Sequence, residues 1–233
     1  MRTIGLIGGM SWESTAHYYA ILNRETARRL GGLHSAPVIV HSLDFAPIAA
    51  MQEADQWQEA GEILADAAAG LAALGCGVVG LATNTMHMVA PAITARLGEV
   101  PFLHISDPTA TALLADGFGR VGLLGTRFTL EKRFYIEGLE ARGLEVLVPE
   151  VDVTNLNGII YDELCRGIVR EESRRVYVDA IARLAARGAE AVILGCTEIN
   201  MLIDESVSPL PTFDTTELHA VALVEAAIAP SEF

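Results

Sequence analysis

One stretch of this sequence occurs twice and decides the fold. Residues 71–81 read Leu-Ala-Ala-Leu-Gly-Cys-Gly-Val-Val-Gly-Leu, and residues 184–194 read Leu-Ala-Ala-Arg-Gly-Ala-Glu-Ala-Val-Ile-Leu. Each begins as the end of a helix, stops at a glycine and continues as an apolar strand. The first strands are also alike, because residues 4–9 read Ile-Gly-Leu-Ile-Gly-Gly and residues 121–126 read Val-Gly-Leu-Leu-Gly-Thr. Segments repeated in the same order predict two halves of similar topology, although unrelated strand-helix units also share such features.

Strands and helices alternate along the whole chain. Apolar runs predict strands at residues 4–7, 37–43, 78–82, 121–124, 145–148 and 191–194. Helical spacing predicts helices at residues 14–30, 55–74, 91–97, 130–141 and, with a break, 159–186. This alternation is typical of α/β folds, in which helices cover parallel sheets.

Composition and charge narrow the classes of partner. A chain of 233 residues with 51% hydrophobic residues, 6% aromatic residues and 21 glycines suits aliphatic parallel strands and tight turns. The net charge of -14 disfavours nucleic acids and anionic membranes. Residues 3–7 already form a core strand, so we expect no signal peptide, and no apolar run reaches the ~18 residues of a membrane span. Three cysteines fit the reducing cytoplasm.

The residues that could perform chemistry follow two equivalent strands. Cys196 follows the strand at residues 191–194, and Thr83 follows the strand at residues 78–82. Ligands of parallel sheets bind beyond the carboxyl ends of the strands, so halves that face each other would bring both side chains to one ligand. Backbone N–H groups at a strand-to-helix turn would lower the thiol pKa from about 8.5. Alternatively, Cys196 is a buried structural cysteine and residues 83–87 are a helix cap.

The remaining motifs are less specific. Gly8-Gly9-Met10-Ser11 lacks the G-x-G-x-x-G spacing of dinucleotide sites, so it suggests only a close approach of backbone to a small ligand. His87 alone is more often a packed or capping histidine than a catalyst. The other histidines are scattered without the close spacing of metal ligands, so we expect no metal site.

The chain resembles the aspartate/glutamate racemase family over almost its full length, and its aspartate racemase branch in particular. Four motifs carry the resemblance: Ile7-Gly8-Gly9-Met10-Ser11, Asn84-Thr85-Met86-His87, Gly122-Leu123-Leu124-Gly125-Thr126 and Gly195-Cys196-Thr197-Glu198. Glu198 favours the aspartate branch, because the glutamate branch usually has histidine there.

The resemblance implies a specific architecture and chemistry. The fold would be α/β, with two pseudo-symmetric domains, each a parallel sheet flanked by helices, and an active site in the cleft between them. The domains would be residues 1–101 plus 212–233 and residues 102–211. Members use no pyridoxal phosphate and no metal, and they are often homodimers, so we expect a cytoplasmic homodimer that needs no cofactor.

The family has two catalytic cysteines, and this sequence departs from that pattern. Thr83 stands at the position of the first cysteine, as in a subgroup of L-aspartate/glutamate-specific racemases that has the same Thr/Cys pair. Cys165 stands near the position where some aspartate racemases have a lysine for the side-chain carboxylate, so the preferred amino acid stays open. The remaining residues expected to bind substrate are Met10, Gln52, Asn84, Thr85, Thr126, Thr197 and Glu198.

The expected reaction is racemisation of an amino acid, with aspartate and glutamate as the leading substrates. Cys196 as thiolate would remove the α-proton, while donors on Asn84, Thr85 and Thr197 stabilise the negative charge. Thr83, or a water that it holds, would return a proton on the other face, although a hydroxyl is a poor base. Two alternatives remain. One is a single-cysteine enzyme such as an arylmalonate decarboxylase or a maleate isomerase, and the other is a binding protein without turnover.

Overall fold

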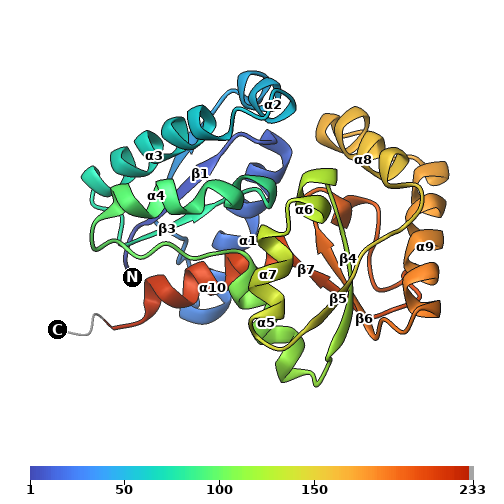
Figure 1. The fold of residues 1–233 in the computed structure, drawn as a ribbon. Coiled ribbons are helices and arrows are strands. Elements are labelled where there is room, and N and C mark those ends of the chain that lie inside the picture. The colour runs from blue at the N-terminus through green and yellow to red at the C-terminus, as the bar shows by residue number, and fades with distance from the viewer. Residues whose placement is uncertain (231–233) are drawn as a thin grey trace. The chain divides into compact units, whose positions relative to one another are not determined.

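The computed structural model describes residues 1–230, which divide into two compact units (Figure 1). The first unit is Met1–Ile105 together with the segment that starts at His219, and the second is Ser106–Leu218. The chain thus passes between the units a few residues later than the boundaries expected after residues 101 and 211. Residues 231–233 of the expected return segment lie outside the described residues.

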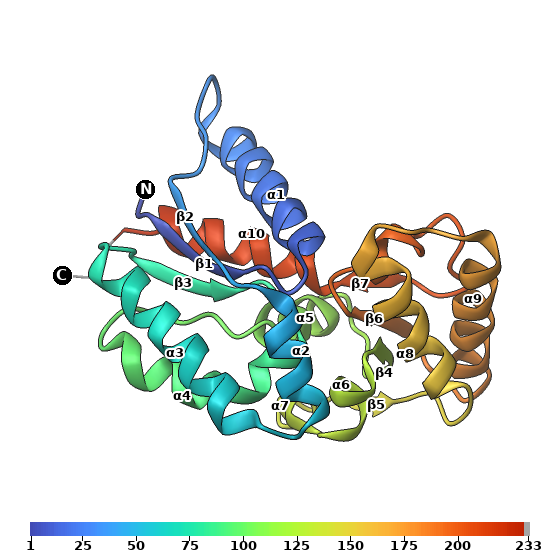
Figure 2. The ribbon, with the colours of Figure 1, turned by 90° about the horizontal axis from the view of Figure 1, so that it is seen from above.

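A three-stranded parallel sheet forms the centre of the first unit. Its order is β2-β1-β3, with β1 at Ile4–Gly8, β2 at Val38–Ser42 and β3 at Val78–Leu81. Successive side chains of β1 point to opposite faces. One face packs against α1 (Trp12–Leu30) and α10 (Thr215–Ile228), and the other packs against α2 (Phe45–Glu53), α3 (Trp57–Ala73) and α4 (Ala90–Leu97) (Figure 2).

A four-stranded parallel sheet forms the centre of the second unit. Its order is β5-β4-β6-β7, with the strands at Glu145–Leu147, Arg120–Gly125, Ala191–Gly195 and Thr212–Asp214. Helices α8 (Val153–Asp162) and α9 (Glu171–Ala186) bury Leu156, Tyr177 and Leu184 against one face. Helices α5 (Ser106–Ala115), α6 (Arg127–Glu131) and α7 (Phe134–Glu140) lie on the other side of this sheet in Figure 1.

The predicted similarity of the two halves is confirmed in their topology. In each sheet the first strand in the chain lies between the second and the third, so β1, β2 and β3 correspond to β4, β5 and β6. All six predicted strands are present. The expected return to the first unit at residue 212 is wrong, because β7 pairs with β6 through Val192–Thr212 and extends the second sheet.

Two predicted helices are each interrupted. The helix predicted at residues 130–141 is two helices, α6 and α7, because Arg133 adopts a left-handed conformation with φ of 57°. The helix predicted at residues 159–186 breaks as expected, at a turn that includes Gly167 with φ of 70°. Helices α2, α5 and α10 were not predicted. No helix within residues 1–230 is long and apolar enough to cross a membrane.

Candidate active site

Cys196 lies immediately beyond the carboxyl end of β6, beside a buried carboxylate. Its thiol donates a hydrogen bond to Glu198 Oε2, and the Sγ–Oε2 distance is 3.0 Å. The hydroxyl of Thr197 donates to the same oxygen, with a distance of 2.9 Å. All three residues are buried. The segment therefore presents one thiol and one hydroxyl to one carboxylate oxygen, away from bulk water.

This environment favours the protonated thiol. Burial raises the pKa of Cys196 well above its ordinary range, and the charge of Glu198 and the hydrogen bond to it raise the pKa further. The expectation of a lowered thiol pKa is therefore wrong. The Glu198 backbone N–H does lower the pKa in the expected direction, but burial and the Glu198 carboxylate outweigh it. The next element is only a three-residue 3₁₀ turn, Ile199–Met201 (η3). In this state Cys196 can give a proton, and it becomes a base only after Glu198 has accepted one.

The neighbouring strand brings Thr126 to the same edge of the second sheet. Gly125 of β4 pairs with Gly195 of β6, so Thr126 and Cys196 follow paired residues. A Cβ on Gly195 would lie 2.6 Å from the Leu124 carbonyl oxygen, which excludes any larger residue. Thr126 is buried and caps α6, where its Oγ1 accepts from the Thr129 N–H at 3.3 Å. Its position fits the predicted site, and its hydroxyl also has a structural task.

In the first unit, Thr83 lies beyond the carboxyl end of β3. The preceding Ala82 N–H donates to the Ile7 carbonyl at 2.9 Å, which continues the pairing of β3 with β1. Thr83, Asn84 and Thr85 are buried and lead into the 3₁₀ helix Thr85–Val89 (η1). The Asn84 side chain makes no capping hydrogen bond to this helix. The geometry of Asn84 therefore does not support the alternative that this turn is only a side-chain cap.

The glycine motif after β1 has a packing reason. A Cβ on Gly9, whose φ is 92°, would lie 2.1 Å from the Leu43 carbonyl oxygen, so only glycine fits. The Gly9 N–H donates to Thr15 Oγ1 at 2.8 Å, and Leu43 N–H donates to the Gly8 carbonyl at 3.0 Å. This turn directs Met10 into the apolar cluster on the α3 face of the sheet. The same close approach of backbone would also suit a small ligand, so packing and ligand binding are compatible at this turn.

Gln52 and Met86 connect α2 to the turn after β3. The Gln52 side-chain amide contacts the Met86 sulfur at 3.0 Å, and both residues are buried. Met86 and Met10 belong to the same buried cluster. The structure therefore gathers Met10, Gln52 and the Thr83–Thr85 turn within the first unit, and Thr126, Cys196, Thr197 and Glu198 within the second.

Sequence reasoning missed two contributions to these sites. Glu198 was expected to bind substrate, whereas its carboxylate is hydrogen bonded to the proposed catalytic thiol. His87 is a packed residue, as expected, and the partner that was not predicted is the Thr83 carbonyl, to which its ring bonds at 2.8 Å. The four-residue separation of Thr83 and His87 across a turn is the signal that could have indicated this second contact.

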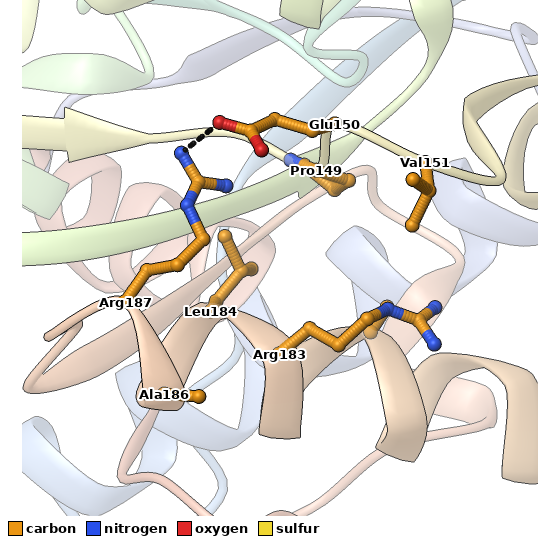
Figure 3. A pocket seen from close by; sticks show the side chains of 8 residues that line it. Pro149, Glu150, Val151, Arg183, Leu184, Ala186 and Arg187 are labelled. Carbon is orange, nitrogen blue, oxygen red and sulfur yellow. Dashed lines mark ion pairs between the residues drawn. The ribbon is translucent and has the colours of Figure 1, made fainter.

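Two pockets of the second unit lie apart from these residues. One of about 280 Å³ lies between α9 and residues 149–151, with Arg183, Leu184 and Arg187 on its α9 side (Figure 3). Arg187 is ion paired with Glu150 at 2.9 Å. The other, of about 220 Å³, includes Asn200 and Asp214. Among residues 1–230, no three His, Cys, Asp or Glu side chains are grouped so that they could hold a metal ion.

Known proteins share this architecture over their whole length. A candidate Asp/Glu racemase from Yersinia pestis is 45% identical, superposes with a TM-score of 0.90, and the match covers 98% of this chain and 100% of that one. An aspartate racemase homologue from Pyrococcus horikoshii is 34% identical with a TM-score of 0.83, again covering 98% and 100%. The broad specificity amino-acid racemase RacX of Bacillus subtilis is 23% identical over 97% of this chain and 98% of its own length.

A family model makes the assignment. The model described as Asp/Glu/Hydantoin racemase matches residues 7–223, which include every predicted site residue. Racemases are isomerases, so the match also fixes the class of enzyme. This chain belongs to the Asp/Glu/Hydantoin racemase family.

Proposed function

We propose that this protein racemises an acidic amino acid, aspartate or glutamate, by exchanging the α-proton between Cys196 and Thr83. The observation that supports the proposal most is the buried thiol–carboxylate pair of Cys196 and Glu198 at the end of β6, with 3.0 Å between Sγ and Oε2. A thiol in this position has both a partner that takes its proton and neighbours that exclude water. The named racemases that the chain resembles support the reaction class.

The proton steps follow from the starting state of the pair. Cys196 begins as a thiol, so its proton first moves to Glu198, and the thiolate then takes the α-proton of the L-amino acid. The resulting carbanion is stabilised at the substrate carboxylate by donors of Asn84, Thr85 and Thr197. A proton from Thr83, or from a water that it holds, bonds to the opposite face of the α-carbon. Glu198 then loses its proton, and Thr83 or its water regains one by way of the solvent, so all three groups return to their starting state and the number of protons balances over a full cycle.

A net charge of -14 makes the capture of a dicarboxylate depend on local donors. We propose that Gln52, Met10 and Thr126 complete the substrate site in the roles expected from the family. Arg166 does not extend this set, because it is exposed and lies 3.6 Å from Asp162. Cys165 is half-buried against the core of the second unit. Neither Arg166 nor Cys165 is therefore proposed to bind the side-chain carboxylate of the substrate.

The reaction as proposed uses neither metal nor pyridoxal phosphate. A Schiff base would need a lysine, and Lys132 is the only one in the sequence. It is exposed and forms the end of α6. Racemisation should therefore persist in Lys132→Arg and after exhaustive chelation. A pyridoxal absorption band that is lost together with activity in Lys132→Arg would overturn this part of the proposal. None of the three cysteines, all within residues 1–230, forms a disulfide bond, which fits the cytoplasmic location that we propose.

The direct test is a racemisation screen. The purified protein is incubated with each L- and D-amino acid, and the enantiomers are separated by chiral chromatography. We expect conversion of aspartate or glutamate and little conversion of neutral amino acids. Ligand-induced stabilisation without α-proton exchange in heavy water would instead identify a binding protein.

One observation favours a second candidate, a decarboxylase with a single cysteine. The raised pKa of Cys196 keeps the thiol protonated, and a protonated thiol suits an enzyme that only donates a proton to a carbanion. Residue 83 is a threonine and offers no second thiol. Assays with prochiral aryl malonates separate the two candidates, because a decarboxylase releases carbon dioxide from them and a racemase does not.

We also propose that two copies of the chain form a homodimer. Five large apolar side chains are exposed on α1, the loop that follows it and the edge strand β2: Trp12, Tyr19, Leu30, Leu33 and Val40. Residues 12–43 contain only two of the 30 acidic residues, so this is a region where two chains of charge -14 can approach. A Tyr19→Ser/Val40→Ser double variant should shift the mass from dimer to monomer in light scattering. Leu74→Ser, at another exposed leucine, is the matched control.

A further inference from the structure

Three histidines meet in the interior of the first unit and take no part in the proposed reaction. The ring of His87 lies 4.5 Å from that of His104 and 5.8 Å from that of His219, measured between centroids. His87 and His219 are buried, at 2% and 0% exposure. Burying such a cluster costs free energy unless the ring nitrogens are hydrogen bonded. The partners of these nitrogens therefore show which main-chain segments the rings hold in place.

The partners define the tautomer of both buried rings. His87 Nδ1 lies 2.8 Å from the Thr83 carbonyl oxygen, which can only accept, so Nδ1 carries the hydrogen. Its Nε2 accepts from the Ile105 N–H at 3.2 Å and must be free of hydrogen. His219 Nε2 donates to the Leu103 carbonyl at 2.9 Å, and its Nδ1 accepts from the Tyr18 hydroxyl at 2.9 Å. The His87 ring is therefore neutral, and burial, which lowers the pKa of His219 to about 3, keeps the His219 ring neutral as well.

The hydrogen bond from His87 Nδ1 restrains the main chain on the carboxyl side of Thr83. On its amino side, the Ala82 N–H donates to the Ile7 carbonyl at 2.9 Å, and the Ala82 carbonyl accepts from Ser14 Oγ at 3.3 Å. The His87 ring then fixes the Thr83 carbonyl itself. Thr83 is thus restrained from both sides, and of these restraints only the one from His87 contacts Thr83 directly.

We infer that His87 is a positioning residue, which holds the Thr83 main chain through its Nδ1–H and thereby aims the Thr83 hydroxyl. The inference rests on the proposed function, in which Thr83 delivers the proton to one face of the α-carbon. The carbonyl carbon and Cβ of Thr83 are both bonded to its Cα, so a shift of the main chain that moves Cα also displaces the hydroxyl. A displacement of about 1 Å can lower a rate about 100-fold. Ile105, on the other nitrogen, is the last residue before the chain enters the second unit.

Two amide variants separate the two nitrogens of the ring. In His87→Asn, the amide nitrogen occupies the place of Nδ1 and can still donate to the Thr83 carbonyl. In His87→Gln, the amide reaches the place of Nε2, so it can accept from Ile105 but cannot bond to Thr83. Both variants remove the titratable ring and differ by one methylene group, so each is the control for the other.

The activity readout compares exchange with inversion. In heavy water, α-proton exchange of the L-enantiomer with retention uses the Cys196–Glu198 pair for proton transfer, whereas racemisation also needs Thr83. We expect His87→Gln to lower racemisation about tenfold or more while exchange stays within about twofold. His87→Asn should preserve the ratio of the unmodified protein. A parallel fall of exchange and inversion in His87→Gln, or equal ratios in the two variants, would overturn the inference.

A second readout does not depend on turnover. In protein labelled at threonine methyl groups, the Thr83 signal, assigned with Thr83→Ser, reports the position of this side chain. Loss of the imidazole ring current shifts this signal in both variants, and we expect a further shift in His87→Gln, where the bond to the Thr83 carbonyl is also lost. If the protein racemises no amino acid but the signals behave in this way, the proposed function fails and the positioning role stands. Equal shifts in the two variants contradict the positioning role whatever the activity.

Discussion

The thiol of Cys196 donates its hydrogen to Glu198 Oε2, two residues further along the chain, across 3.0 Å. The carboxylate stabilises the protonated thiol through this bond and through its charge, and both effects raise the pKa of Cys196. The same oxygen is also an acceptor within reach of the thiol proton. Glu198 therefore disfavours the Cys196 thiolate in the resting state, and it accepts the thiol proton when the thiolate forms during the reaction.

These two roles predict opposite effects of Glu198→Gln on the thiol and on turnover. Loss of the charge should lower the pKa of Cys196, because the repulsion between the carboxylate and the thiolate disappears while burial remains. Turnover should fall by about 100-fold or more, since the amide cannot accept the proton. The thiol pKa is measured by thiolate absorbance or by the pH dependence of alkylation. Unchanged or faster turnover together with a lower pKa would show that Glu198 only suppresses the thiolate.

The three cysteines should differ in their importance for activity. Cys196→Ala should reduce racemisation to background with the fold intact, because the reacting sulfur is lost. Cys165→Ala should keep most of the activity, since this half-buried side chain packs against the apolar cluster. Cys76→Ala should also keep it, because Cys76 is buried in the first unit against Gly5. Substantial turnover by Cys196→Ala, measured on protein with a native circular dichroism spectrum, would remove it from the mechanism.

The fold was predictable because strand positions depend on local apolar runs. The repeated segments at residues 71–81 and 184–194 correctly predicted that β3 and β6 are equivalent. Interruptions were harder to predict, because the left-handed conformation of Arg133 has no glycine to indicate it. Strand β7 has only three residues and is stabilised by pairing with β6, a long-range contact that periodicity does not reveal.

The chemical state of the site was less predictable than its position. Cys196 was found from its place after a strand, which depends on the sequence alone. Its raised pKa depends on burial and on the direction of the Glu198 side chain, and neither can be read from the order of residues. The hydrogen bond from His87 to Thr83 was unpredictable for the same reason, because the spacing of the two residues does not show whether the ring faces this turn or solvent.

The pair of Thr83 and Cys196 should treat the two enantiomers unequally in exchange experiments. Cys196 becomes a base once Glu198 accepts its proton, whereas a threonine hydroxyl is a poor base near neutral pH. In heavy water, L-aspartate or L-glutamate should exchange its α-proton readily and the D-enantiomer slowly. Thr83→Cys should raise the exchange of the D-enantiomer toward that of the L. Catalytic efficiencies for net racemisation must still match in both directions, because the enantiomers have equal free energy.

The measurement is deuterium incorporation into each enantiomer, followed by mass spectrometry after chiral separation. Thr83→Val, which keeps the shape but removes the hydroxyl, is the matched control and should slow exchange of the D-enantiomer further. Equal exchange of both enantiomers in the unmodified protein, with no gain in Thr83→Cys, would point to a different second base.

The buried histidines predict that stability falls below neutral pH. Burial lowers the pKa of His219 to about 3, and burial with the neighbouring His104 and His219 lowers the pKa of His87 well below its ordinary range. Above about pH 6.5 both rings are neutral in the folded and unfolded states, so they add no pH dependence. Below that pH the two histidines are protonated in the unfolded chain but stay neutral in the folded protein, so the free energy of unfolding decreases. Each histidine contributes about 1.4 kcal/mol per pH unit.

Denaturation in urea at pH 7.5 and 5.5 measures this loss in a range where most carboxyl groups stay ionised. The two histidines together should lower the free energy of unfolding by about 3 kcal/mol between these values. In His219→Gln, whose amide can still donate to the Leu103 carbonyl, the loss should fall to about half, because one titrating ring is gone. His34→Gln, at an exposed position, should leave the loss unchanged. An equal loss in His219→Gln and the unmodified protein would mean that the His219 ring titrates alike in the folded and unfolded states.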